Sequence, residues 1–376
     1  MSKKVIVIDD SALMRRVISD IIESDDRFTV ASTAANGLDA LDQIVKEPKR
    51  FDLAILDINM PKMNGIEFLE RIEKLNLSLK VIVVSTVAKE GAKETIRCLE
   101  LGAFDFVTKP ESFIEAKGDG FRQRIIQKLC IASGYEEEKK RTHETVSAEE
   151  SIKRETVSNI KQISALRTGN VKAEKKAFHP AGANAKKLIA LACSTGGPKA
   201  LNCLIPMLPK NLNAPMLIVQ HMPEGFTNSL ALRLDELSEI KVKEAEHGEN
   251  IKNGVVYIAK GGSQLRLKQN GKNYSLQVTV EEARNGLKPC ADIMYESLLD
   301  CDFDEIICVV LTGMGADGTL GISQLNDKKN IYVISQTKET CIVYGMPKVV
   351  AEAGLSNEVV PLEKIAESIK KIVGVH

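Results

Sequence analysis

The stretch LIALACSTGGP at residues 188–198 is a run of apolar residues that ends in a serine and two glycines. Three polar side chains follow such runs: Ser194 after this one, His221 after MLIVQ at 216–220, and Asp317 after IICVVLTGMGA at 306–316. Short apolar runs indicate buried strands of a parallel sheet, and open α/β sheets place their sites at the carboxyl edge. We therefore expect these three side chains to meet at one edge, as nucleophile, base and orienting acid.

The turn STGGP supplies what a serine nucleophile needs. Its glycines permit a tight bend with exposed backbone N–H groups, and Pro198 can begin the following helix. Such N–H groups near Thr195 and Gly196 would stabilise an oxyanion, and losing one donor of this kind typically costs about 3 kcal/mol. His221 is the one histidine of this half that ends a strand-like run, so it is the candidate base.

More strand-like runs alternate with helical stretches from residue 185 to residue 376. Within them, QLRLKQNGKNYSLQVTV at 264–280 predicts a β-hairpin that turns at Asn270-Gly271. The sequence therefore predicts a second domain at 185–376, an α/β fold with a doubly wound parallel sheet and a β-hairpin insertion.

The front of the chain, residues 1–130, alternates five apolar runs with five amphipathic stretches: VIVI, FTVAST, LAIL, VIVV and FDFV precede helical patterns at 11–24, 37–46, 65–74, 90–101 and 113–129. Five such units predict a parallel sheet that is covered on both faces, a flavodoxin-like α/β fold. Between the two domains, residues 131–184 are rich in Glu, Lys, Ser and Thr, which predicts a charged flexible linker, with a transient helix as the alternative.

Polar residues end the strands of this first domain as well. They are Asp9 and Asp10 after the first strand, Asp57 after the third, Ser85 after the fourth and Lys109 after the fifth. Three carboxylates at one edge repel each other unless a cation lies among them, and an all-oxygen set suits Mg²⁺. Lys109 and Ser85 could bind the oxygens of a phosphoryl group.

Composition narrows the classes of partner. Lys plus Arg equals Asp plus Glu at 51 each, and no basic recognition helix is evident, so we expect no nucleic-acid binding. Eight cysteines without a CxxC pair suit reduced thiols, and the start MSKKVIVIDD matches neither a signal peptide nor a membrane span. We expect a soluble cytoplasmic protein without membrane insertion.

A dinucleotide-binding site is the rival interpretation of the second domain. Gly313, Gly315 and Gly318 form a GxGxxG, the pattern of dinucleotide sites.

The front segment resembles the receiver domain of bacterial response regulators, on Asp9-Asp10, the run DINMP at 57–61, Ser85-Thr86 and Lys109-Pro110. The resemblance implies that Asp57 accepts a phosphoryl group from a chemotaxis histidine kinase. It implies that Mg²⁺ binds to Asp10, Asp57 and the backbone carbonyl of Asn59, with Phe106 at the aromatic switch position.

The rear segment resembles the catalytic domain of chemotaxis protein-glutamate methylesterases (the CheB family), on ACSTGGP, QHMPEGFTNSLALRLD, GVVYIAKGG, LTGMGADGTLGI and IVYGMPKVVAEAG. The catalytic serine, histidine and aspartate of that family fall on Ser194, His221 and Asp317, and Thr195 and Met314 match positions that line its pocket. Two stretches depart from the family pattern, since HRPSVD is here LKPCAD at 287–292 and the usual PG after YIA is Lys260-Gly261.

The resemblance implies a hydrolase that demethylates glutamate γ-methyl esters on the cytoplasmic helices of chemoreceptors and also deamidates receptor glutamines, with no cofactor in the catalytic domain. We expect the resting receiver to cover the active-site edge, and phosphorylation at Asp57 to shift the domains apart. The alternative is a phosphorylation-dependent binding module in which the serine site is vestigial.

Overall fold

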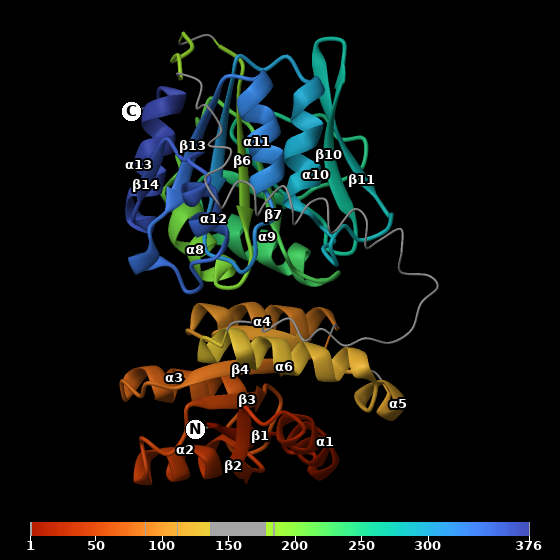
Figure 1. The fold of residues 1–376 in the computed structure, drawn as a ribbon, viewed down its shortest axis with the longest axis vertical. Helices are drawn as coiled ribbons and strands as arrows, with labels where there is room; N and C mark the ends of the chain where they lie inside the picture. Colours follow the sequence, from red (N-terminus) through yellow and green to blue (C-terminus); the bar gives the residue numbers. More distant parts are fainter. Residues whose placement is uncertain (1, 87, 111, 136–177, 183–184, 376) are drawn as a thin grey trace. The chain divides into compact units, whose positions relative to one another are not determined.

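Two parallel β-sheets organise the chain (Figure 1). The computed structural model describes residues 2–375 except 87, 111, 136–177, 183 and 184. The chain divides into two units, Met1–Lys139 and Lys140–His376, and each has its own sheet. The predicted linker at 131–184 lies for the most part outside the described residues, so its conformation stays a prediction.

The first unit has a five-stranded sheet of order β2-β1-β3-β4-β5, in which all neighbours are parallel. Its elements are β1 Lys3–Ile8, α1 Ala12–Glu23, β2 Phe28–Ala34, α2 Gly37–Lys46, β3 Leu53–Asp57, α3 Gly65–Lys74, β4 Lys80–Ser85, α4 Lys89–Glu100, β5 Asp105–Thr108, α5 Phe113–Ala116 and α6 Asp119–Ser133. The predicted flavodoxin-like receiver fold is confirmed.

Local sequence sets where these helices begin. Ser11 accepts a hydrogen bond from the N–H of Met14 at the start of α1, and Asn64 and Glu67 form a capping box at the start of α3. The single helix predicted over 113–129 is wrong, because the structure has a short α5 and a separate α6. Gly118 lies between them in an extended conformation, which ends the first helix.

The second unit has a seven-stranded sheet of order β14-β13-β12-β6-β7-β9-β8 and a two-stranded sheet β10-β11. Its elements are β6 Lys187–Cys193, α8 Gly197–Leu204, η1 Ile205–Met207, β7 Met216–Gln220, α9 Phe226–Leu237, β8 Lys241–Glu244, β9 Val255–Ile258, β10 Gln264–Asn270, β11 Asn273–Thr279, α10 Ala291–Ser297, η2 Leu298–Asp300, β12 Glu305–Val310, α11 Thr319–Lys328, β13 Ile331–Gln336, η3 Lys338–Thr340, α12 Met346–Glu352, β14 Glu358–Val360 and α13 Leu362–Val373.

The central strands of this sheet are buried along their whole length, as their apolar runs predict. β6, β7 and β12 have no exposed residue, and each pairs in parallel with its neighbours. Alternate residues of β6, Leu188, Ala190 and Ala192, join a core cluster with Tyr295 of α10 and Ile322 of α11. The predicted parallel α/β fold is confirmed, and the carboxyl ends of β6, β7 and β12 lie at one edge of the sheet.

The predicted hairpin is present, but its turn lies one residue further along the chain. Asn270 pairs with Asn273, so Gly271 and Lys272 are the two turn residues. Gly271 has φ +62°, and a glycine at the first position suits the primed turns that match the twist of a hairpin.

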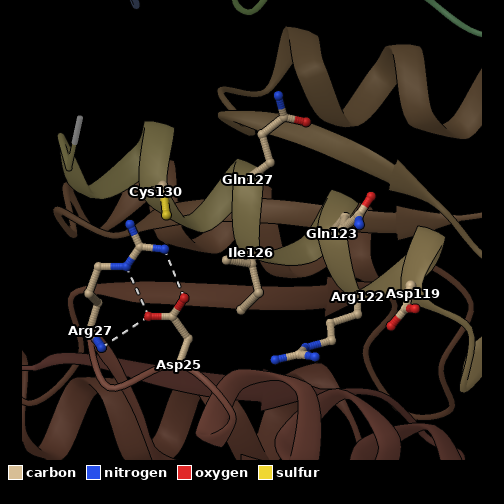
Figure 2. A pocket seen from close by; sticks show the side chains of 8 residues that line it. All are labelled: Asp25, Arg27, Asp119, Arg122, Gln123, Ile126, Gln127 and Cys130. Atoms are coloured by element: carbon tan, nitrogen blue, oxygen red, sulfur yellow. Dashed lines mark hydrogen bonds and ion pairs between the residues drawn. The ribbon is translucent and has the colours of Figure 1, made fainter. Parts of the chain in front are cut away.

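A pocket in the first unit lies beside α6 (Figure 2). Three of its charged side chains have partners within the unit, since Arg27 bonds to Asp25 at 2.8 Å and Arg122 donates to Ser24 Oγ at 3.1 Å. Its lining includes none of the predicted site residues. Among the described residues, no helix is long and apolar enough to span a bilayer.

Candidate active site and phosphorylation site

The predicted nucleophile and base lie at the tips of two neighbouring strands. β6 ends at Cys193 and β7 ends at Gln220, and these two residues are partners in the parallel register. The N–H of His221 donates to the carbonyl of Cys193 at 3.2 Å, so the pairing continues beyond the strands. Ser194 and His221 are therefore brought together, and both remain partly accessible.

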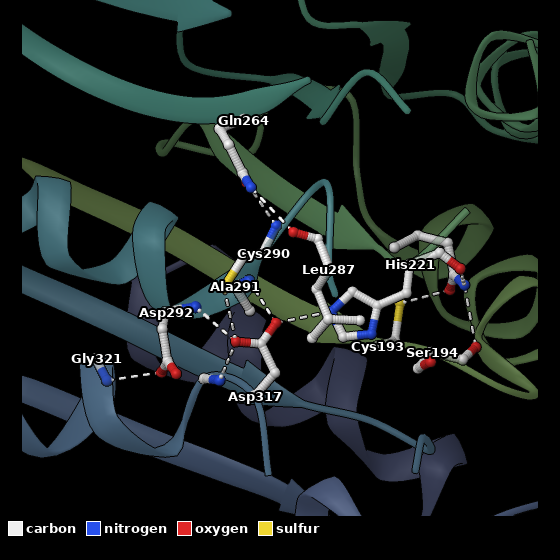
Figure 3. A network of polar contacts seen from close by, with 12 residues as sticks. Cys193, Ser194, His221, Gln264, Leu287, Cys290, Ala291, Asp292, Asp317 and Gly321 are labelled. Carbon is white, nitrogen blue, oxygen red and sulfur yellow. Dashed lines mark hydrogen bonds and ion pairs between the residues drawn. The ribbon is translucent and has the colours of Figure 1, made fainter. Parts of the chain in front are cut away.

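Asp317 follows β12, which pairs with the other side of β6. Its Oδ2 lies 2.7 Å from Nε2 of His221. Figure 3 shows the imidazole between this carboxylate and Ser194, with its second ring nitrogen on the serine side. Within the described residues, no hydrogen bond joins Ser194 Oγ to the ring. Catalytic hydrogen bonds often tighten only when substrate binds.

Asp317 lies in a cradle of further donors. The N–H groups of Ala291, Asp292 and Gly318 donate to its carboxylate at 2.6, 3.0 and 3.0 Å, and Cys290 Sγ lies 3.1 Å from Oδ1 (Figure 3). Burial alone would raise the pKa of Asp317, but the hydrogen bond and charge of His221, with the amides of Ala291 and Asp292, lower it to about 2. The group is therefore a carboxylate that can stabilise an imidazolium.

A second buried acid lies beside this carboxylate. Asp292 accepts a hydrogen bond from the N–H of Gly321 at 2.8 Å, and oxygens of Asp292 and Asp317 lie within 4.8 Å of each other. Burial, followed by the negative charge of Asp317, raises the pKa of Asp292 to about 8. One proton on the pair avoids two adjacent buried charges. The sequence analysis named Asp292 only as the last residue of the stretch LKPCAD and predicted no function for it. The one sequence feature that could have indicated it is an acid in the first turn of a helix.

The loop that carries these donors is held by a buried glutamine that the sequence analysis missed. Gln264, at the start of β10, accepts a hydrogen bond from the N–H of Cys290 at 2.8 Å and donates to the carbonyl of Leu287 at 3.0 Å. Leu287 and Lys288, which depart from the family pattern, are both half-buried in this loop. The backbone of the loop is thus fixed through its carbonyl and amide groups.

The predicted oxyanion residues Thr195 and Gly196 follow the serine in the turn before α8. Gly196 has φ +81°, a conformation that favours glycine, and it is the N-cap of α8. Thr195 is buried beside it. Gly313, which precedes the half-buried Met314, packs so closely that a Cβ there would lie 2.8 Å from Ser194 Cβ. The helix start and its partial positive charge lie next to the hydroxyl.

Two glycines of the rival dinucleotide pattern, Gly313 and Gly318, pack against protein, and the third, Gly315, has φ +88°, a conformation that favours glycine. A Cβ on Gly313 would lie 2.5 Å from Met346 Sδ, and one on Gly318 would lie 3.0 Å from the ring of Tyr295. The strand that follows ends at Gln336, whose amide bonds to Thr312 and Thr340. The packing at Gly313 and Gly318 and the backbone conformation of Gly315 account for these glycines without a nucleotide.

The first unit brings its predicted acids and lysine together. Nζ of Lys109 lies 3.2 Å from Asp9 Oδ2 and 3.0 Å from Asp57 Oδ2, and both carboxylates are buried. Burial raises the pKa of Asp57 to about 6, against the lowering effect of Lys109 and with a further rise from Asp9. Burial likewise raises the pKa of Asp9. One ammonium group thus partners two acids.

Three further predicted residues of this site are Asp10, Asn59 and Phe106. Carboxylate oxygens of Asp9, Asp10 and Asp57 lie within 4.8 Å of one another, and Asp10 is exposed. This oxygen set fits Mg²⁺, because it is acid-rich and open to water on one side. The side chain of Asn59 donates to Glu94 at 3.2 Å, and the predicted ligand of this residue is its backbone carbonyl. Phe106 is buried.

The hydroxyl of Ser85 is engaged away from the acids. It donates to the carbonyl of Gly91 at 3.1 Å and accepts from Thr95 Oγ1 at 2.6 Å. The predicted contact with a phosphoryl group would require this hydroxyl to turn.

Both units match known protein families. The family model described as CheB methylesterase matches residues 189–369, and the response regulator receiver domain matches residues 5–117. A protein-glutamate methylesterase/protein-glutamine glutaminase 1 of Syntrophomonas wolfei is 39% identical over 98% of each chain. The corresponding protein of Halalkalibacterium halodurans is 42% identical over 97% of each chain.

Among solved structures, the catalytic domain of the Thermotoga maritima CheB methylesterase is 43% identical and covers 50% of this chain and 98% of its own, with a TM-score of 0.48. The similarity to the two full-length relatives extends through both units and exceeds what a shared fold alone would give. The chain belongs to the family of protein-glutamate methylesterases/protein-glutamine glutaminases, with a response regulator receiver domain at its amino-terminal end.

Proposed function

We propose that this protein hydrolyses glutamate γ-methyl esters on the cytoplasmic helices of chemoreceptors and releases methanol. Ser194 would be the nucleophile, His221 the base and Asp317 the orienting acid. The observation that carries the proposal is the 2.7 Å contact between His221 Nε2 and Asp317 Oδ2 at the strand tip next to Ser194. The relatives named after this activity align with the chain from end to end.

In the first half of the reaction, Ser194 Oγ attacks the ester carbonyl and its proton passes to the free ring nitrogen of His221. Asp317 stabilises the imidazolium through Nε2–H, and backbone N–H groups near Thr195 and Gly196 stabilise the oxyanion. The carbon–oxygen bond to the methoxy group then breaks. His221 returns the proton, methanol leaves, and the glutamyl group remains esterified to Ser194.

In the second half, water gives a proton to His221 and attacks the acyl group, which releases glutamate and restores the serine. The receptor gains one negative charge for each ester that is hydrolysed. A glutamine side chain can enter the same sequence with ammonia as the leaving group, which is the basis for proposing the deamidase activity as well.

The receiver would control this reaction through phosphorylation of Asp57 by a chemotaxis histidine kinase, in the cytoplasm. Asp9, Asp10, Asp57 and the carbonyl of Asn59 would hold Mg²⁺. The ion, when bound, supplies positive charge against the phosphoryl oxygens. Lys109 places its ammonium against Asp57, and Ser85 offers a hydroxyl once it leaves Gly91.

The test is methanol release from methylated chemoreceptor by the full chain, with and without a small-molecule phosphodonor. Ser194→Ala should reduce turnover by about 10⁴-fold or more, the scale seen for serine relays. Near-normal methanol release by this variant would reject the assignment of the nucleophile. The alternative, a phosphorylation-dependent binding module, predicts receptor binding without methanol release by the unaltered protein.

A further inference from the structure

Gln220 is a buried amide at the junction of the strands that carry the nucleophile and the base. It is the last residue of β7, after four apolar residues, and it is only 2% exposed. A buried amide without partners costs about 1–3 kcal/mol for each unsatisfied group, so its contacts show why it is tolerated there.

Each polar atom of this amide has a partner at the site. Nε2 donates to the carbonyl of Ser194 at 3.1 Å and to the carbonyl of His221 at 3.2 Å. Oε1 lies 3.0 Å from Cys193 Sγ, which can donate to it. One side chain thus ties together the backbone of the two residues that must exchange a proton.

We propose that Gln220 is a positioning residue for the hydrolysis, an inference that rests on the proposed function of Ser194 and His221. It holds both residues through their backbone carbonyls and does not touch the reacting atoms. A misplacement of about 1 Å at a catalytic group can cost on the order of 10²-fold in rate, so such a clamp affects turnover directly.

The clamp also orients the predicted oxyanion donor. The carbonyl of Ser194 accepts from Gln220 Nε2 and from the N–H of Gly197 at 2.7 Å, so its direction is fixed twice. In a planar trans peptide the carbonyl and the following N–H point in opposite directions. Holding the Ser194 carbonyl therefore directs the N–H of Thr195 away from Gln220.

Gln220 also accounts for the second glycine of the STGG turn. A Cβ at Gly197 would lie 1.9 Å from Gln220 Oε1, which no packing tolerates. Gly197 does not have a positive φ, so its conformation alone does not require glycine. Gly197 and Gln220 are therefore in direct contact, and the effect of a substitution at one on stability should depend on the residue at the other.

Gln220→Met in the full chain tests the clamp, because methionine keeps the unbranched shape and removes both donors. We expect kcat for methanol release to fall by about 10²-fold with little change in KM. Labelling of Ser194 by a fluorophosphonate should slow in parallel, which reports the nucleophile without a receptor. The matched control is Gln336→Met, another fully buried glutamine at a strand end, whose amide bonds to Thr312 and Thr340 and, within the described part of the chain, not to Ser194 or His221. It should lose thermal stability but keep near-normal kcat.

A double-mutant cycle separates positioning from folding. Gly197→Ala alone should destabilise the fold, and Gln220→Ala should make room for the new methyl group, so the double variant should be more stable than the sum predicts. Turnover and labelling should stay low. Recovery of turnover together with stability, or normal kcat in Gln220→Met, would overturn the inference. If the unaltered protein released no methanol, the proposed function would fail instead, while serine labelling would still measure the effect of Gln220.

Discussion

His221 bonds to Asp317 through Nε2, at 2.7 Å from Oδ2, so the ring nitrogen left for the serine is Nδ1. In chymotrypsin-type relays the two nitrogens have the opposite assignment. β6, which precedes Ser194, lies between β7 and β12, so the imidazole that follows β7 reaches across toward the carboxylate that follows β12. The tautomer with a proton on Nε2 leaves Nδ1 free to accept the serine proton.

Replacing Asp317 by asparagine should test this tautomer. The amide can donate to Nε2 and so favour the ring form that lacks a lone pair on Nδ1. We expect kcat for methanol release to fall by about 10⁴-fold, as for the same change in serine proteases, with little loss of fold. Circular dichroism would verify folding, and turnover within a few-fold of normal would show that Asp317 is not the orienting acid.

Asp292→Asn is the matched comparison, because the neighbouring acid should be neutral near pH 7. Its pKa of about 8 lies above its ordinary value of 3.8, so between these values the folded protein holds a proton that the unfolded chain releases. Stability of the unaltered protein should therefore decline as pH rises through that window. Asparagine has no such proton, so the variant should gain in thermal midpoint relative to the unaltered protein as pH rises.

Activity is the second readout of the Asp292→Asn variant. Asparagine can keep the hydrogen bond from Gly321, so kcat near pH 7 should stay close to normal, in contrast to Asp317→Asn. A thermal midpoint difference that does not change with pH would mean that Asp292 is ionised in the folded protein.

The position of His221 and Asp317 directly after apolar runs was enough to predict that they meet, because parallel strands bring their carboxyl ends to one edge. The cradle of Asp317 could not be predicted in the same way. Its donors at 290–292 begin α10, and only the tertiary fold brings that helix start to the acid. Gln220 also escaped notice, since the sequence showed only the end of an apolar run.

In the fold as well, some elements could be predicted from the sequence pattern and others depend on tertiary packing. The buried strands β6, β7 and β12 were evident as apolar runs, whereas β8, with the sequence KVKE, lies at the sheet edge and lacks such a run. The break between α5 and α6 occurs at Gly118, inside a stretch whose apolar spacing suggested one helix. Edge strands and helix breaks depend on tertiary contacts, and the spacing of apolar residues in the sequence does not show those contacts.

Magnesium binding should depend on pH through Asp57. Because burial raises its pKa to about 6, the carboxyl is increasingly protonated below that value and should lose the ion. Isothermal titration calorimetry should show affinity falling as pH decreases through about 6, and bound ion should stabilise the fold by about 2.7 kcal/mol at a concentration 100-fold above Kd. Asp10→Asn removes the exposed carboxylate and should weaken binding. Equal affinity in this variant would place the ion elsewhere.

Phosphorylation should act through Asp57 alone among the carboxylates of the first unit. In the full chain, a small-molecule phosphodonor should raise methanol release by the unaltered protein, and a tenfold rise needs only about 1.4 kcal/mol of preference between two states. Asp57→Asn should keep basal turnover but lose the rise, because an amide cannot form the acyl phosphate. The control is Asp52→Asn, because Asp52 lies outside the predicted phosphorylation site and pairs with Lys3 at 2.9 Å. The phosphodonor should activate this variant normally. Activation of Asp57→Asn to the normal level would show that another residue accepts the phosphoryl group.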